Sequence, residues 1–363
     1  MNADPLRIGL IGAGHIARAQ AAIWQNEATL VAVASRQRPK AEALARSFQV
    51  ECVFDTPDEL IASDRVDAIS IATPPHLHYP FAMQAIRARK NVFCEKPLAV
   101  NAEQAREMWA CGQQHGVATG IQSGIRTSFP GLWHLKNIID SHELGELLYF
   151  EGIWAFDWAR QPDFPMGWRF RRDLAGTGAL GDLGVYLIDA ARWLIGEIQS
   201  VAADFQTIIA ERPVISDLYD FSEVRGMIRD SRLPASTGPA RVENEDACSL
   251  LVRFTNGATG TIRASRIGRR NTILVEGTEA AFQWDLQTGV LGRRGAGEVA
   301  YTPVPLPDGF PNRSIVTQFI ENIRNVTNHP PTFWDGFRAQ QVIDAAVQAV
   351  QTRRWIDISD GSE

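Results

Sequence analysis

A glycine-bearing loop after the first apolar run constrains the fold more than any other feature of the sequence. In residues 6–11 the apolar side chains first alternate and then become continuous, as suits a buried parallel strand, and the residues after the loop favour a helix. Between them, Gly12, Gly14 and Ala17 form a G-x-G-x-x-A pattern. Such a loop lets backbone N–H groups approach a pyrophosphate, although glycine pairs are also common at ordinary strand ends. The pattern predicts a dinucleotide-binding Rossmann unit whose cofactor contacts include Gly12, Ala13, Gly14, His15 and Ile16.

Length and composition indicate a globular protein with room for two domains. The chain has 363 residues, of which 45% are hydrophobic and 21% charged, and its formal net charge is -6. This balance does not favour nucleic acid or an anionic membrane as a partner, and no apolar run approaches the roughly 20 residues that span a bilayer. The start, MNADPLRIGL, lacks the features of an export signal, so we expect a cytoplasmic protein. Its four cysteines show neither C-x-x-C pairs nor histidines at metal-ligand spacing, so we expect reduced thiols and no metal.

The end of the second expected strand bears on the choice of cofactor. It falls at Ser35, about twenty residues beyond the glycines, where a dinucleotide fold reads the adenosine ribose. An acid there would bind the 2′-hydroxyl of NAD, but this chain has Ser35 and Arg36, followed by Arg38 and Lys40. A hydroxyl and cations suit a phosphate, so the sequence favours NADP over NAD. The alternative is a solvated basic helix start.

Two further strand ends add polar groups to the same edge of the predicted sheet. Residues 66–72 read as a strand with an extended Thr-Pro-Pro exit, and residues 91–94 read as another that runs into a glutamate and a lysine. Open α/β sheets hold their ligands at the carboxyl ends of such strands, although a salt-bridged strand end is the alternative for the second pair. We therefore expect further cofactor contacts at Ala72, Thr73, Pro74, Pro75, His78, Glu95 and Lys96.

The second half of the chain has a different pattern. From residue 145, several strands follow one another without intervening helices, which predicts an α+β domain with a large open, mostly antiparallel sheet. We therefore expect an α/β protein with a Rossmann domain at 1–125 and an α+β domain at 126–363. Residues 210–245 are polar and weakly periodic, and they predict a surface excursion. Helices at about 314–325 and 335–352 are expected to complete the second core.

One predicted helix, within GTGALGDLGVYLIDAARWLIG, carries candidate catalytic groups. Asp182, Tyr186 and Asp189 have the spacing i, i+4 and i+7, which places them on one stripe of a helix. The stripe is either the wet face of an amphipathic helix or a functional surface. The glycines before it favour the second interpretation, because they allow close approach to another domain.

Taken together, these motifs resemble those of the Gfo/Idh/MocA oxidoreductases, the group of glucose-fructose oxidoreductase and inositol dehydrogenase. The resemblance covers nearly the whole chain and includes Glu95-Lys96-Pro97, the Trp168-Arg169 pair and G-x-L-x-D-x-G-x-x-x-x-D at 178–189. Segments such as WRF and GALGDLG are most similar to the branch acting on inositol, L-glucose and levoglucosan. The resemblance implies a Rossmann domain, an open-sheet domain, NAD(P) as cofactor and homodimers or homotetramers formed through the C-terminal sheet.

The resemblance also assigns site residues by position. It makes Lys96 the catalytic lysine, Asp182 a substrate-binding aspartate and Arg169 an arginine near the sugar, while Tyr186 replaces the commoner histidine. An ammonium within about 4 to 6 Å of a phenol lowers its pKa, so we predict Tyr186 as general acid/base with Lys96 as its electrostatic partner. The predicted substrate-binding residues are Lys96, Asp157, Trp168, Arg169, Asp182 and Tyr186.

The predicted reaction is hydride transfer between NAD(P) and a secondary alcohol or ketone of a cyclic polyol or sugar. A keto-sugar, nucleotide-sugar or dihydrodiol oxidoreductase is an alternative within enzymes. A non-catalytic NAD(P)-binding sensor is an alternative of another class. Retention of Lys96, Asp182 and an acid/base at Tyr186 argues against a sensor.

Overall fold

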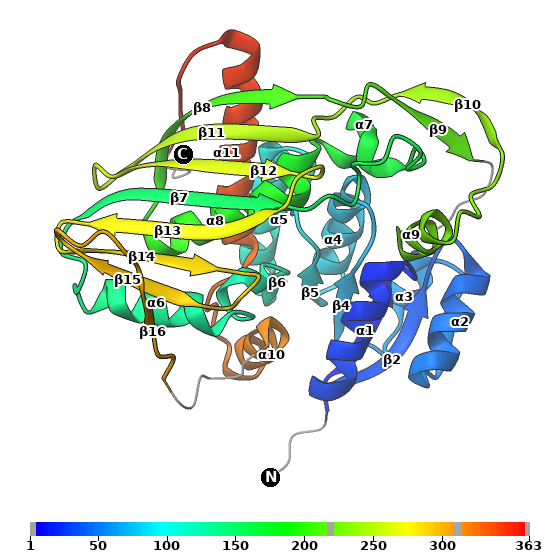
Figure 1. Cartoon of the computed structure of the whole chain (residues 1–363). Coiled ribbons are helices and arrows are strands. Elements are labelled where there is room, and N and C mark those ends of the chain that lie inside the picture. Colours follow the sequence, from blue (N-terminus) through cyan, green and yellow to red (C-terminus); the bar gives the residue numbers. More distant parts are fainter. Residues whose placement is uncertain (1–4, 216–220, 308–313, 360–363) are drawn as a thin grey trace.

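Two sheets organise the chain (Figure 1), and the computed structural model describes residues 5–215, 221–307 and 314–359. The first sheet is entirely parallel and has the strand order β3-β2-β1-β4-β5-β6. Its order reverses between β1 and β4, which is the kind of position where open α/β sheets bind ligands. Its strands are β1 Arg7–Ile11, β2 Thr29–Ala34, β3 Cys52–Phe54, β4 Ala68–Ile71, β5 Asn91–Cys94 and β6 Thr119–Ile121.

Helices cover both faces of this sheet, which explains why most residues of its central strands are apolar and buried. Ile8, Leu10 and every residue of β4 are buried. The buried indole of Trp24 donates to the Ser70 hydroxyl at 2.9 Å and so ties a covering helix to the central strands. The helices are α1 His15–Glu27, α2 Arg38–Phe48, α3 Pro57–Ala62, α4 His78–Arg87 and α5 Ala102–His115. The predicted Rossmann architecture is confirmed.

The second sheet has nine strands in the order β16-β15-β14-β13-β7-β12-β11-β8-β17. Only β7 and β12 pair in parallel among these described strands, so the prediction of a large, mostly antiparallel sheet is confirmed. Its strands are β7 Leu147–Ala155, β8 Ile198–Gln206, β11 Ala247–Phe254, β12 Thr259–Ser265, β13 Arg270–Gly277, β14 Ala280–Asp285, β15 Leu291–Gly295, β16 Thr302–Val304 and β17 Ile356–Asp357.

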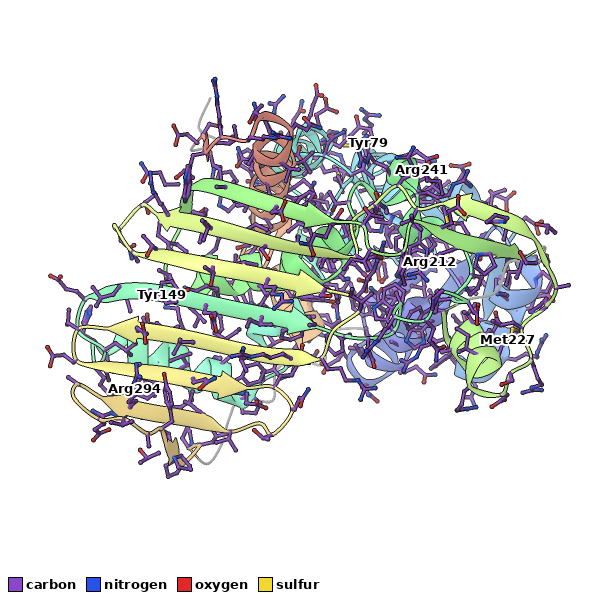
Figure 2. All side chains as sticks on the ribbon, turned by 45° about the horizontal axis from the view of Figure 1, so that its top comes forward. Tyr79, Tyr149, Arg212, Met227, Arg241 and Arg294 are labelled. Carbon is purple, nitrogen blue, oxygen red and sulfur yellow. The ribbon has the colours of Figure 1, made fainter. Side chains whose placement is uncertain are left out.

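One face of the second sheet packs on helices, and the other is open. The packed face contributes Phe150, Ile262 and Ile273 to a core shared with α6 Pro130–Asp140 and α8 Val185–Leu194. The open face is turned toward the viewer in Figure 2, where Tyr149 marks the central strand β7. The alternating burial of β11 and β12 follows from this one-sided packing.

The two closing helices pack differently from the prediction that both complete the second core. α10, Ile315–Asn325, places Ile315 and Phe319 in the Rossmann core beside β1 and Phe93. α11, Phe333–Thr352, serves both cores, because Phe337 lies in the first and Val342 in the second. Residues 315–337 therefore help to complete the nucleotide-binding half of the molecule.

Within residues 210–245, where the sequence predicts a surface excursion, the described residues include two strands and a helix. β9 Glu211–Ile215 pairs antiparallel with β10 Ser236–Arg241, and between them lies α9 Phe221–Arg229. Residues 216–220 lie outside the described part of the chain. Arg212, at the base of β9 in Figure 2, is fully buried and donates to three main-chain carbonyls. The sequence does not reveal these strands and this helix, because the contacts that hold them are long-range and leave no local periodicity.

Candidate active site

A cavity of about 100 Å³ lies between the carboxyl edge of the first sheet and the start of α8. Residues after β4 and β5 line one side, and residues of the second domain line the other. The cavity therefore joins the Thr-Pro-Pro segment, the Glu-Lys-Pro segment and the predicted catalytic helix. The lining consists of Ile16, Thr73, Pro75, Glu95, Lys96, Pro97, Trp168, Arg169, Ala175, Thr177, Gly178, Gly181, Asp182 and Tyr186.

Lys96 joins the two halves of this cavity. Its ammonium donates to the main-chain oxygen of Asp182 at 2.7 Å and to Oδ1 of the same residue at 3.2 Å. The same nitrogen lies 4.8 Å from the centroid of the Tyr186 ring. An ammonium from the first domain therefore meets a carboxylate and a phenol from the second.

The charges of these three groups follow from burial and from one another. Burial disfavours the charge of Lys96, but Tyr186, Asp182 and Glu95 more than offset this, so the pKa of the ammonium is raised. Burial also opposes ionisation of Asp182, yet Lys96 and Arg169 hold the pKa of this carboxyl below its usual value. The site therefore holds a lysine cation beside an aspartate anion.

The pKa of Tyr186 differs from the sequence prediction. Burial raises the pKa of the phenol above its ordinary value, and Lys96 opposes this rise without reversing it. The expectation that the ammonium lowers the pKa is therefore wrong as a net effect, because the sequence reveals the lysine but not the depth of burial. The phenol is protonated at neutral pH in the protein alone.

Arg169 is the second cation in the site. Its Nε lies 3.5 Å from Oδ2 of Asp182, and its guanidinium carbon lies 4.2 Å from the centroid of the Trp168 ring. Its main-chain oxygen accepts from Arg266 and from Asn244, each at 3.1 Å. Asp182 is thus shared between Lys96 and Arg169, and the backbone beneath Arg169 is fixed.

A π-helical turn, Leu180–Gly184, carries Asp182 into the cavity. The carboxylate of Glu245 accepts from the backbone N–H groups of Gly178 and Leu180 at 2.8 and 2.9 Å. A Cβ at Gly178 would lie 2.1 Å from the main-chain oxygen of Glu245, so the close approach requires glycine. Nothing in the sequence around Glu245 predicts this contact, since the partners are 67 residues apart.

Asp189 and Asp157 have partners elsewhere. Asp189 is buried and accepts from Ser123 and from Nε of Arg126, the latter at 2.9 Å, so it fixes α8 within the core. This burial also rules out a wet face at that position. The carboxylate of Asp157 accepts from Nε of Arg269 at 2.6 Å, and Asp157 is not among the described residues that line the cavity. The structure therefore does not place Asp157 at the predicted substrate site.

The glycine loop has the shape that a dinucleotide requires. Gly12 has φ +123°, and a Cβ there would lie 2.4 Å from the main-chain oxygen of Ala72. Gly14 precedes α1 without a side-chain cap, and a Cβ there would meet no atom within 4 Å. The buried hydroxyl of Thr73 has no hydrogen-bond partner in the described part of the chain. Open space, uncapped N–H groups and an unsatisfied hydroxyl together fit NAD(P).

His78 lies beneath the cofactor region rather than along the predicted groove. The ring is fully buried, with Nδ1 2.9 Å from the Pro97 oxygen and Nε2 2.8 Å from the Thr73 oxygen. Burial lowers its pKa to about 4, although both carbonyls favour a proton on the ring. His78 therefore ties the exits of β4 and β5 together.

The region expected to bind the adenosine ribose contains paired charges. The Ser35 hydroxyl accepts from the backbone of Gln37, and Arg36 is exposed. Arg38 pairs with Glu42 and Asp55, while the Lys40 ammonium lies 3.1 Å from the carboxylate of Glu223 on α9.

The described residues contain no cluster of side chains suited to a metal ion. Among the same residues, no helix combines the length and the apolar character that a membrane span needs.

Comparison with known families matches both halves of the chain. Residues 6–123 match the oxidoreductase family with an NAD-binding Rossmann fold, and residues 132–283 match the GFO/IDH/MocA C-terminal domain. The chain therefore belongs to the Gfo/Idh/MocA oxidoreductase family, which confirms the resemblance seen in the sequence.

Individual relatives include several sugar and polyol dehydrogenases. The chain is 30% identical to levoglucosan dehydrogenase of Pseudarthrobacter phenanthrenivorans, over 97% of this chain and 98% of that one. It is 28% identical to inositol 2-dehydrogenase of Rhizobium meliloti, over 98% and 99% of the two chains. The structure of levoglucosan dehydrogenase in complex with NADH and levoglucosan is similar, with a TM-score of 0.84 and 26% identity over 98% of this chain and 99% of that one.

Proposed function

We propose that this oxidoreductase moves a hydride between NAD(P) and a secondary alcohol or ketone of a cyclic polyol or sugar. The observation that carries the proposal is the meeting of Lys96, Asp182 and Tyr186 in one cavity at the ligand-binding edge of the Rossmann sheet. The names of the relatives support the substrate class, since they include levoglucosan, inositol and glucoside dehydrogenases.

Each residue has a distinct task in this proposal. Bound NAD(P) supplies the hydride acceptor or donor. In oxidation, the phenolate of Tyr186 takes the proton of the reacting hydroxyl, and Lys96 stabilises both that phenolate and the alkoxide-like oxygen of the substrate. Asp182 accepts a hydrogen bond from a neighbouring hydroxyl, while Arg169 and Trp168 offer a cation and an aromatic face to the sugar.

The raised pKa of Tyr186 makes the two directions respond differently to pH. The protonated phenol is ready to donate to a forming alcohol, so reduction proceeds at neutral pH. Oxidation first requires loss of the phenolic proton to solvent, so its rate rises as pH rises toward the pKa. Reduction is therefore expected to reach its maximal rate at a lower pH than oxidation.

The cofactor, the assembly and the location complete the proposal. We favour NADP over NAD, because Ser35 and the exposed Arg36 follow β2 where an acid would select NAD. We also propose a homodimer or homotetramer formed through the open face of the second sheet, where Leu251 is 52% exposed. Free cysteines, three of them buried, are consistent with a cytoplasmic location.

A substrate panel tests this proposal. The purified protein is incubated with NAD⁺ or NADP⁺ and inositols, levoglucosan or hexoses, and with NADH or NADPH and the matching ketones, while absorbance of the reduced nicotinamide is followed. Turnover of free polyols or sugars supports the proposal, and turnover of nucleotide-linked sugars or aromatic diols alone favours the alternative enzymes. Cofactor binding without any turnover favours a sensor.

A further inference from the structure

α9 belongs to the second domain in sequence but lies at the ligand edge of the first. In Figure 1 it lies beside the ends of α1 and α2, and Met227 marks it in Figure 2. Its first residue, Phe221, contacts the ring of His15 in the glycine loop, with the centroids 6.0 Å apart. The centroid of the Phe221 ring also lies 5.0 Å from that of the Trp158 ring and 5.1 Å from the guanidinium carbon of Arg169. These contacts hold the start of α9 between the glycine loop and the substrate cavity.

The next turn of α9 is anchored as well. Val224 is buried in a small core with Ala159 and Phe170. Between these two anchors, Glu223 reaches across to α2, and its carboxylate lies 3.1 Å from the Lys40 ammonium. The pair is half-exposed, so its contribution to stability is small. Its position is more informative, because Lys40 is in the first turn of the helix that follows Ser35 and Arg36.

The cations near this strand end differ in their availability to a phosphate. Arg38 is paired with Glu42 and Asp55 on its own domain, and Lys40 is paired with Glu223 from the other. A 2′-phosphate that used Lys40 would have to displace a carboxylate of the same sign from it. A 2′-hydroxyl carries no charge and would not compete. The carboxylate thus opposes NADP much more than NAD.

We propose that Glu223, supplied by α9, is a cofactor-selectivity residue that competes with the 2′-phosphate of NADP for Lys40. This inference depends on the proposed function only in that the glycine loop binds NAD(P). Glu223 thereby opposes the preference for NADP that Ser35 and Arg36 support. Selection between the two cofactors then depends on the docking of α9 as well as on residues 35–40.

Direct binding measurements test this inference. Dissociation constants for NADH and NADPH are measured by nicotinamide fluorescence and calorimetry in the full-length protein and in Glu223→Gln. We expect affinity for NADPH to increase relative to NADH by about tenfold, the change that 1.4 kcal/mol produces. Asp230→Asn is the matched control, because Asp230 lies just beyond α9 and pairs with Arg229 and Arg232. Adding Lys40→Gln to Glu223→Gln should abolish the gain, since the gain requires the charge of the Lys40 ammonium.

Several results would overturn the inference. The first is a ratio of NADPH to NADH affinity in Glu223→Gln that stays within about twofold of the wild-type ratio. The others are an equal change in affinity for both cofactors and the same shift of the ratio in Asp230→Asn. Each would show that Glu223 acts only in domain contact or through net charge. Binding of neither cofactor to the wild type would overturn the proposed function together with this inference. Binding without turnover of any sugar would overturn the proposed function alone.

Discussion

The ammonium nitrogen of Lys96 lies 4.8 Å from the centroid of the Tyr186 ring, and the same nitrogen donates to Asp182. Lys96 follows strand β5 of one sheet, whereas Asp182 and Tyr186 come from the π-helical turn and from helix α8 beneath the other sheet. The first half of the chain supplies the cation, and the second half supplies the phenol and the carboxylate. The proposed chemistry therefore depends on how the two domains pack together.

Removal of either group should impair turnover. We expect Lys96→Ala and Tyr186→Phe each to lower kcat by at least about 10²-fold, because each removes part of the proton-transfer machinery. Tyr79→Phe is a matched control, since that phenol, on α4, donates to the carboxylate of Glu107 on α5 and does not line the cavity. Steady-state kinetics with the best substrate of the panel measures the effect, and near-normal kcat in either variant would contradict the assignment.

Replacement of Tyr186 by histidine should shift the pH profile of oxidation. The phenol has a raised pKa, whereas imidazole titrates near 6.5, so the rise of kcat with pH should move to lower pH in Tyr186→His. The measurement is kcat from about pH 5 to 10. A profile that does not move would mean that another group accepts the proton.

The two acids of the site helix should have different effects. Asp182→Asn removes a carboxylate that faces the cavity, so we expect lower turnover with a melting temperature close to that of the wild type. Asp189→Asn deprives the buried Arg126 of a charged partner and should cost about 3 kcal/mol of unfolding free energy. Urea unfolding and kinetics on both variants check this, and an unchanged midpoint in Asp189→Asn would be inconsistent with the buried pair.

Substitution of the two glycines in the nucleotide loop should have different effects, one on stability and the other on cofactor binding. Gly12→Ala combines φ +123° with a clash against Ala72 and should lower stability by about 1–3 kcal/mol. Gly14→Ala places its methyl in open space, so the melting temperature should not change. That methyl lies where backbone should approach the pyrophosphate, and we expect at least about tenfold weaker NAD(P)H binding by fluorescence titration. Unchanged affinity in Gly14→Ala would mean that the cofactor does not approach this residue.

The buried ring of His78 should make the fold sensitive to acid. The unfolded ring binds a proton below about pH 6.5, whereas the folded ring stays neutral until about pH 4. Stability from this group is therefore present above pH 6.5 and is lost as the pH falls toward 4, to a total of about 3 kcal/mol. Urea unfolding at several pH values measures this, and the unfolding free energy should fall less steeply with decreasing pH in His78→Gln than in the wild type. Identical slopes would argue against a neutral buried ring.

Much of the fold can be predicted because its signals are local. The apolar run before Gly12, the Thr-Pro-Pro exit and the strand that leads to Lys96 each place a strand end at one edge, and a parallel sheet brings those ends together. The spacing of Asp182 and Tyr186 likewise fixes their common helix face. Local pattern was therefore enough to place Lys96, Asp182 and Tyr186 near one another, but it also placed Asp157 with them, which the cavity lining does not include.

What could not be predicted depends on distant contacts. α9 is held by His15 and by the small core around Phe170, and α10 is held by the Rossmann strands, so neither location is encoded in its own periodicity. The pairing of Asp157 with Arg269 joins residues 112 positions apart. The pKa of Tyr186 depends on how completely the surrounding chain excludes water.

The return of α10 and α11 to the first half of the molecule has a consequence for biosynthesis. The ribosome completes the glycine loop and its strands early, but the apolar side chains that cover them come from residues 315–337. Until those residues emerge, a hydrophobic patch on the nascent Rossmann unit lacks its native cover. Acquisition of a stable nucleotide-binding fold is thus coupled to synthesis of nearly the entire polypeptide.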